Sequence, residues 1–457
     1  MQGTRKYGLT ITIFLPSFQD TASVRVRGSK MRLLNTETLK LSEFCPEFPE
    51  YAILSHRWEE DEVSYQDLQA NKNQEGAGYR KIQKCCEKAL RDGYVWVWID
   101  TCCIDKTSSA ELSESINSMF KWYQTSAQCY AYLSDVEEVT CEGKRSHPSF
   151  NDSVWFTRGW TLQELLAPRE MLFLDTNWNE IGTRASLNEE ITTATGIPNR
   201  AYASLESYTV AQRMSWASNR KTTRVEDIAY SLLGIFDVNM PLLYGEGHRA
   251  FPRLQEEIIK RSDDESIFVW HVDDQQEERS LISKLQDQIH LALTENEKCL
   301  FAFPTRATGS GRLLAPRPSC FAHCASVRRD VFVWRRPYSL TNKGLEFMTL
   351  LFKDPEESKF EKLLIPLNCT DGGDVPLAIS LTRSFGYWMR CGSAEMPGSA
   401  ESLLEVMRNE DEARQIHISA QWPCHPVANV LLLNPRLNTE SGEETITFQS
   451  PPARYEI

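Results

Sequence analysis

The sequence has no excess of positive charge. Its 457 residues include 50 Lys and Arg against 63 Asp and Glu, the formal net charge is −13, and no basic tract offsets this balance. Proteins bind the nucleic-acid backbone through clustered lysines and arginines. We therefore expect no nucleic-acid partner.

Long apolar runs are absent as well. No segment approaches the roughly 18 apolar residues that cross a bilayer, so we expect no membrane span. Arg5 and Lys6 precede a short apolar segment at 9–16, but threonines interrupt it and no small-residue cleavage site follows. We interpret residues 1–30 as a flexible N-terminal extension and expect the first domain to begin at Met31.

The 13 cysteines lack the spacing of a disulfide framework or of a zinc site. Cys85 and Cys86 are adjacent in sequence, as are Cys102 and Cys103, and such neighbours seldom bridge each other. We expect reduced, mostly buried thiols in a cytoplasmic protein, and no bound metal. The residues nearest to a metal cluster match no standard pair of zinc knuckles; they are Cys320, His323, Cys324, Cys424 and His425.

Apolar segments of strand length alternate with helical segments from residue 51 to residue 174, after a strand or hairpin at 32–44. This alternation predicts an α/β fold with a parallel, doubly wound sheet. In such sheets the ligand crevice lies beyond the carboxyl ends of the strands. The expected strands are 51–55, 94–99, 128–134 and 170–174, and the helices between them are 79–90, 108–123 and 155–168.

Polar side chains follow the first two of these strands. The first strand runs into the segment Ser55–Trp58, and the second is followed by Asp100 and Asp105. We expect them to meet the helix at 155–168 on one rim of the sheet. The alternative that the two carboxylates only cap turns and neighbouring helices stays open.

The helix at 155–168 carries a single carboxylate, Glu164. Trp160 lies four residues before it, so the two share a helix face and the indole can shield the carboxylate from water. Shielding raises the pKa of a carboxyl group and suits it to catalysis. The alternative is that Glu164 caps the helix or pairs with Arg158.

After residue 262 the pattern changes from helical to β-like. We assign 31–180 to the α/β core and 181–262 to added helices. Residues 263–457 are expected to form a separate, mostly antiparallel β domain with an amphipathic helix at 402–409 and no catalytic site. Its β-like segments include SIFVWHV at 266–272, CLFAF at 299–303, DVFVWRR at 330–336, LEFMTLLF at 345–352 and PLAISLTRSF at 376–385.

Three blocks resemble the fungal heterokaryon incompatibility (HET) domain family. They are YAILSHRW at 51–58, VWIDTCCIDKTSSAELSESINSMFKWY at 97–123 and WFTRGWTLQELLAP at 155–168, and the segment 213–247 is similar to the usual sequel. Glu59 stands where many members have glycine. No GxxxxGK[ST] motif is present, so nothing indicates nucleotide-driven assembly within the chain.

The resemblance implies a fungal intracellular protein of non-self recognition and programmed cell death, with a TIR/flavodoxin-like sheet. TIR enzymes, to which HET domains are considered related, cleave NAD with a glutamate four residues past a tryptophan, as in Trp160 and Glu164. The implied substrate is therefore NAD, with no cofactor. Glu164 would be catalytic, and the implied substrate-binding residues are Ser55, His56, Arg57, Trp58, Asp100, Asp105, Arg158 and Trp160.

Two other functions remain open. In the first, the domain is a non-catalytic module that forms a homo-oligomer or binds another protein, and its motifs serve only for packing. Alternatively, the fold would have been recruited as an enzyme of secondary metabolism.

Overall fold

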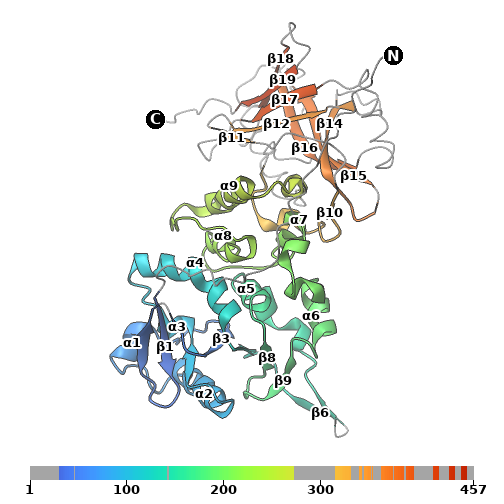
Figure 1. The fold of residues 1–457 in the computed structure, drawn as a ribbon. Coiled ribbons are helices and arrows are strands. Elements are labelled where there is room, and N and C mark those ends of the chain that lie inside the picture. The colour runs from blue at the N-terminus through green and yellow to red at the C-terminus, as the bar shows by residue number, and fades with distance from the viewer. Residues whose placement is uncertain are drawn as a thin grey trace, which may run out of the picture.

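The computed structural model describes residues 30–271 apart from 46 and 142–143, then 314–330, and beyond these the strand segments and one turn between 339 and 449. Figure 1 shows an α/β part at one end of the molecule, helices α7–α9 in the middle and a β-rich part at the other end. The expected flexible extension at 1–30 and the helix expected at 402–409 lie outside the described residues, except for Lys30.

The α/β part is built on a seven-stranded sheet in the order β2–β1–β4–β3–β5–β8–β9. The four central strands are parallel, while β1, β2 and β9 are antiparallel additions. This confirms the predicted α/β fold with a mostly parallel sheet. The strands are β1 Met31–Asn35, β2 Leu41–Phe44, β3 Ala52–His56, β4 Trp96–Trp98, β5 Gln128–Tyr132, β8 Met171–Leu174 and β9 Glu180–Thr183.

The order in which strands are added to the sheet changes direction at β3. The chain passes from β3 to β4 on one side and then crosses back to β5 on the other side. Such a point opens a crevice at the carboxyl ends of the strands. The connecting helices are α1 Tyr65–Gln69, α2 Ala77–Arg91, α3 Asp100–Cys103, α4 Ser109–Thr125 and α5 Thr161–Leu166, and β6 Val139–Cys141 and β7 Lys144–Ser146 form a separate hairpin.

Helices follow the sheet after β9, which ends at Thr183 within the range 181–262 that was expected to be helical. They are α6 Asn188–Thr195, α7 Val210–Ser215, α8 Asp227–Tyr230 and α9 Ala250–Arg261. Local sequence explains two of them: Thr209 and Gln212 form a capping box for α7, and α9 buries the apolar face of Phe251, Leu254 and Ile258. Among the described residues, no helix combines the length and the apolar character needed to cross a membrane.

The prediction of a strand at 266–272 is wrong. The segment begins as a 3-10 helix, Glu265–Phe268, because the Asp264 carboxylate accepts a hydrogen bond from the Ser266 N–H and starts a turn. A second bond, from the Val210 N–H to Asp264, fixes this turn against α7. The apolar residues of 267–270 are buried in the core.

The β-rich part is one sheet of ten strands, and it is antiparallel except where β17 pairs with β19. The expectation of a mostly antiparallel sheet is therefore confirmed for the described strands, whereas CLFAF and most of DVFVWRR lie outside them. The strands are β10 Arg328–Arg329, β11 Ser339–Thr341, β12 Gly344–Leu350, β13 Phe352–Lys353, β14 Lys362–Thr370, β15 Pro376–Ser384, β16 Tyr387–Glu395, β17 Gln415–Ala420, β18 Leu432–Leu437 and β19 Glu444–Gln449.

Candidate functional site

Ser55 lies near the carboxyl end of β3, where the order of strand addition changes direction, and it is fully buried. Its hydroxyl donates a hydrogen bond of 2.5 Å to Oε2 of Glu164 and accepts one of 2.9 Å from Nε1 of Trp155. Strand β3 and the helix α5 with its preceding turn are thus joined by one continuous chain of hydrogen bonds. The predicted meeting of the first strand with the Glu164 helix is what the structure shows.

Glu164 is buried, with only 7% of its surface exposed. Burial raises the pKa of its carboxyl group to about 8 because the charged form is poorly solvated, and the negative charge of Asp100 adds to this. Hydrogen bonds from Ser55 and Tyr123 and the charge of Arg158 act in the opposite direction. At neutral pH the carboxyl group is therefore mostly protonated.

The tryptophan linked to Glu164 is Trp155, which the sequence reasoning did not select. Trp160 is the N-cap residue of α5, and its indole lies beside Asp227. Trp155 is almost fully buried and packs its ring edge to face against Phe173 of β8. Both tryptophans belong to the same block, WFTRGW, so spacing alone could not identify which indole reaches the site.

Arg158 does not neutralise Glu164. Among the described residues, no ion pair involves the Glu164 carboxyl group, and the Arg158 guanidinium donates instead to the Thr223 hydroxyl at 3.4 Å. The alternative in which Glu164 is occupied by a salt bridge with Arg158 is therefore not the observed arrangement.

His56 and its neighbours form a cluster of buried polar atoms. Nε2 of His56 lies 3.6 Å from Oε1 of Glu62 and 3.9 Å from Oδ1 of Asp100. Within the described part of the chain, both ring nitrogens of His56, Oδ1 of Asp100, Oε2 of Glu62 and Oγ1 of Thr101 have no hydrogen-bond partner. Because a buried polar atom without a partner costs about 1–3 kcal/mol, this cluster is suited to receive the polar groups of a ligand.

Lys81 neutralises the acidic side of the cluster. Its ammonium contacts the Glu62 carboxylate, lies 3.7 Å from Glu59 and points towards the backbone carbonyl of Arg57. Burial alone would raise the pKa of Glu62, but the imidazole of His56 and the ammonium of Lys81 lower it to about 2. Glu59, which departs from the family pattern, thus has a charge partner here.

Trp58 forms the exposed rim of the cluster. Its side chain is 45% exposed, its Nε1 donates to Oδ2 of Asp100 at 2.7 Å, and the Lys106 ammonium lies 3.6 Å from the ring centre. A cation over an indole face is attracted by about 0.5–2 kcal/mol. The Arg57 side chain is exposed next to it.

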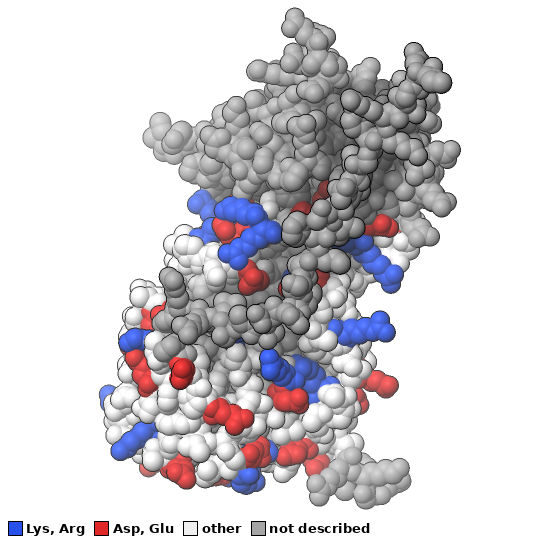
Figure 2. Space-filling view, in the orientation of Figure 1, with Lys and Arg blue, Asp and Glu red and all other residues white. Residues whose placement is uncertain are grey.

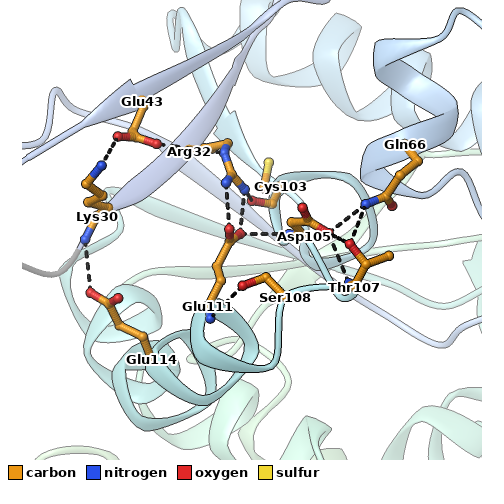
Figure 3. A network of polar contacts seen from close by, with 10 residues as sticks. All are labelled: Lys30, Arg32, Glu43, Gln66, Cys103, Asp105, Thr107, Ser108, Glu111 and Glu114. Atoms are coloured by element: carbon orange, nitrogen blue, oxygen red, sulfur yellow. Dashed lines mark hydrogen bonds and ion pairs between the residues drawn. The ribbon is translucent and has the colours of Figure 1, made fainter.

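Asp105 is engaged in local structure. Its carboxylate accepts hydrogen bonds from Gln66 at 2.6 Å and from the Thr107 hydroxyl at 2.6 Å, and its backbone N–H donates to Glu111 (Figure 3). Glu111 is in turn bound by the guanidinium of Arg32. Of the two candidate carboxylates, Asp100 lies in the cluster and Asp105 supports a turn.

The described residues contain no group of three or more potential ligands that could hold a metal ion. Cys320 and Cys324 are buried, and Cys424 and His425 lie outside the described residues. On the face drawn in Figure 2, acidic and basic side chains are interspersed over the α/β part.

Two family models match the chain. Residues 51–149 match the heterokaryon incompatibility protein (HET) model, and residues 249–336 match a domain of unknown function, DUF8212. The first match contains Ser55, His56 and Asp100, whereas Glu164 lies beyond its end. The second match begins within the helical part, at the start of α9.

The vegetative incompatibility protein HET-E-1 of Podospora anserina is 50% identical over 220 residues, which are 46% of this chain. The aligned region is only 16% of that relative's length. No solved structure matches the chain.

Proposed function

Because this chain is a fungal HET domain protein, we propose that it acts in vegetative incompatibility, the process named in its Podospora relative, and that its HET domain cleaves NAD. The observation that carries the chemical part is the Glu164 carboxyl group. It is buried, no ion pair involves it among the described residues, and the charge of Asp100, whose Oδ1 is unpartnered there, acts on it. A strongly perturbed carboxyl group in such a place indicates a functional site.

The proposed reaction breaks the bond between nicotinamide and ribose. Nicotinamide leaves with the bonding electrons, the ribose becomes an oxocarbenium-like cation, and water adds to it and releases a proton. The cationic substrate favours ionisation of Glu164, whose carboxylate then stabilises the ribose cation. A group with a pKa of about 8 is also suited to accept the proton from water near neutral pH.

Substrate entry requires the rim to move, since Glu164 is only 7% exposed. Trp58 is the exposed aromatic side chain of the rim, and no helix or strand constrains the chain between His56 and α1. We propose that Trp58 leaves its contacts with Asp100 and Lys106 and stacks on a ring of the substrate. Self-assembly of the chain would drive this movement, so activity would depend on protein concentration.

The other predicted residues take roles according to their position. His56 and Asp100 would bind ribose hydroxyls through their unpartnered atoms, and exposed Arg57 would bind the pyrophosphate. Arg158 is half-buried and is therefore less accessible than Arg57 for binding the pyrophosphate. Buried thiols such as Cys85 and Cys102 fit the cytoplasmic location that the proposal requires.

The test is NAD consumption by the purified full chain at several protein concentrations. Glu164→Gln should abolish the activity and keep the fold, because glutamine resembles the protonated carboxyl group. Glu189→Gln, an exposed change on α6, is the matched control and should retain activity. Full activity in a folded Glu164→Gln variant would reject the assignment of Glu164.

The burial of Glu164 favours a second candidate, a non-catalytic interaction module. In that case the bond with Ser55 is purely structural, and the chain signals by binding itself or another protein. Absence of NAD loss at every concentration, together with concentration-dependent oligomers in sedimentation, would support this candidate.

A further inference from the structure

A cavity of about 480 Å³ lies at the edge of the sheet where β8 begins, next to the end of α5. Its walls come from the residues before β8, the end of β9 and the 3-10 helix Asn199–Tyr202. Strand β8 is parallel to β3, so this edge carries the amino ends of the parallel strands. The cavity is therefore separate from the candidate site at the carboxyl ends.

The walls of this cavity carry excess positive charge. Arg169, Arg184 and Arg200 line it together with a single acidic residue, Glu170. The guanidinium of Arg184 donates to the backbone carbonyls of Leu165 and Arg169, both at 2.9 Å. Among the described residues, none of the three arginines forms an ion pair; the charge of Glu170 acts on Arg184, and the walls keep an excess of positive charge.

The inner side of the cavity has hydrogen-bond donors without acceptors. The Tyr202 ring lies against Arg184, 4.5 Å from its guanidinium carbon, and the Tyr202 hydroxyl is buried without a partner. Arg220, whose charge acts on both Tyr202 and Glu164, is 6% exposed, and its Nη2 also has no partner in the described part of the chain. Unpartnered donors at buried positions indicate that an acceptor is missing.

We infer that this cavity binds the phosphoryl group of a small organic phosphate. Guanidinium groups match phosphate oxygens in pairs, and the Tyr202 hydroxyl supplies a further donor. The volume is in the range of small-molecule sites and exceeds the size of an inorganic ion. The inference is independent of the proposed NAD reaction, because the cavity uses other residues at the other edge of the sheet.

Titration calorimetry of the full chain with pyrophosphate as the probe tests this. The unmodified chain should bind saturably, and Arg169→Glu and Arg200→Glu should each weaken binding about tenfold or more. Both side chains are exposed, so these changes spare the fold. Arg249→Glu is the matched control, an exposed arginine away from the cavity, and it should leave the affinity unchanged.

Further variants separate this cavity from the candidate NAD site. Tyr202→Phe should weaken pyrophosphate binding several-fold and leave NAD consumption unchanged. Absence of saturable binding, or equal affinity in Arg200→Glu and the unmodified chain, would overturn the inference. Loss of binding in Arg57→Glu alone would also overturn it, because the probe would then occupy the other edge of the sheet.

Discussion

At the scale of single residues, the central feature of the candidate site is the chain of hydrogen bonds from Trp155 through Ser55 to Glu164. The Ser55 hydroxyl donates to Glu164 and accepts from Trp155, so its O–H bond has one orientation. The carboxyl group is held in place before any substrate arrives. Its high pKa follows from burial rather than from one strong partner.

Glu164→Gln should change how stability depends on pH. The pKa of Glu164 rises from 4.5 to about 8 in the folded chain, so the folded state holds an extra proton between these values. Stability should therefore fall as pH rises from 4.5 to 8 and level off above, by at most about 5 kcal/mol. Urea unfolding of both proteins between pH 5 and 9 measures this; parallel pH profiles of the two would contradict it.

Ser55→Ala should destabilise the chain by about 1–3 kcal/mol, because it leaves the Trp155 N–H and the Glu164 carboxyl group buried without their partner. The lost bond also lowered the pKa of Glu164, so that pKa should rise further. Carboxyl chemical shifts followed against pH measure the second effect. Ser109→Ala, an exposed change at the start of α4, should alter neither quantity.

At the scale of elements, Arg32 connects β1 to the segment between α3 and α4. Its guanidinium holds Glu111 through both terminal nitrogens and donates to the carbonyl of Cys103 (Figure 3). It also lies 4.5 Å from the centre of the Tyr65 ring. The antiparallel strand β1 is thereby fixed to the end of α3 and the first turn of α4. Sequence spacing alone does not show this contact, because 79 residues separate its partners.

Glu111→Gln should cost about 1–3 kcal/mol, because Arg32 and Glu111 are mostly buried and their bond is bidentate. Glu43→Gln is the matched control, since Glu43 is 45% exposed and lies 4.0 Å from Arg32. That control should change stability by less than about 0.5 kcal/mol. Thermal unfolding of the two variants compares them; equal losses would contradict a special role for Glu111.

At the scale of the whole molecule, helices α7 and α9 join the HET part to the segment 314–330. The Gln255 amide exchanges two hydrogen bonds with the backbone of Ala315, and the Thr209 hydroxyl donates to the carbonyl of Val327. Figure 1 shows these helices between the two sheets. The second family match begins at α9, which agrees with this shared packing.

Gln255→Met should loosen this junction. It removes both bonds and leaves the Ala315 N–H and carbonyl unpaired at a fully buried position, at a cost of roughly 2–4 kcal/mol. Limited proteolysis should then cut the chain earlier than in Glu257→Gln, a control that breaks only a half-exposed ion pair on the same helix. Identical digestion of the two variants would show that the junction depends on other contacts.

Periodicity was sufficient for the parallel strands and for helices α2 and α4, because each strand is largely buried and each of these helices buries one stripe. The helix expected at 155–168 is a 3-10 turn at Val154–Thr157 followed by the α-helix Thr161–Leu166. Periodicity failed at 266–272, where the Asp264 side chain starts a turn that an apolar pattern cannot reveal. The motif blocks led to Ser55, His56 and Asp100. The same blocks did not separate Trp155 from Trp160, since both are aromatic and close to Glu164.

By itself, the sequence determined the α/β class, the HET family and the segments that supply the candidate site, because these depend on local patterns and on motifs. Only the tertiary structure decided that Ser55 holds Glu164, that Asp100 joins His56 while Asp105 supports a turn, and that arginines surround a cavity at the edge where β8 begins. The physical reason is that pKa values and partners depend on burial and on contacts between residues distant in the chain. No local pattern contains that information.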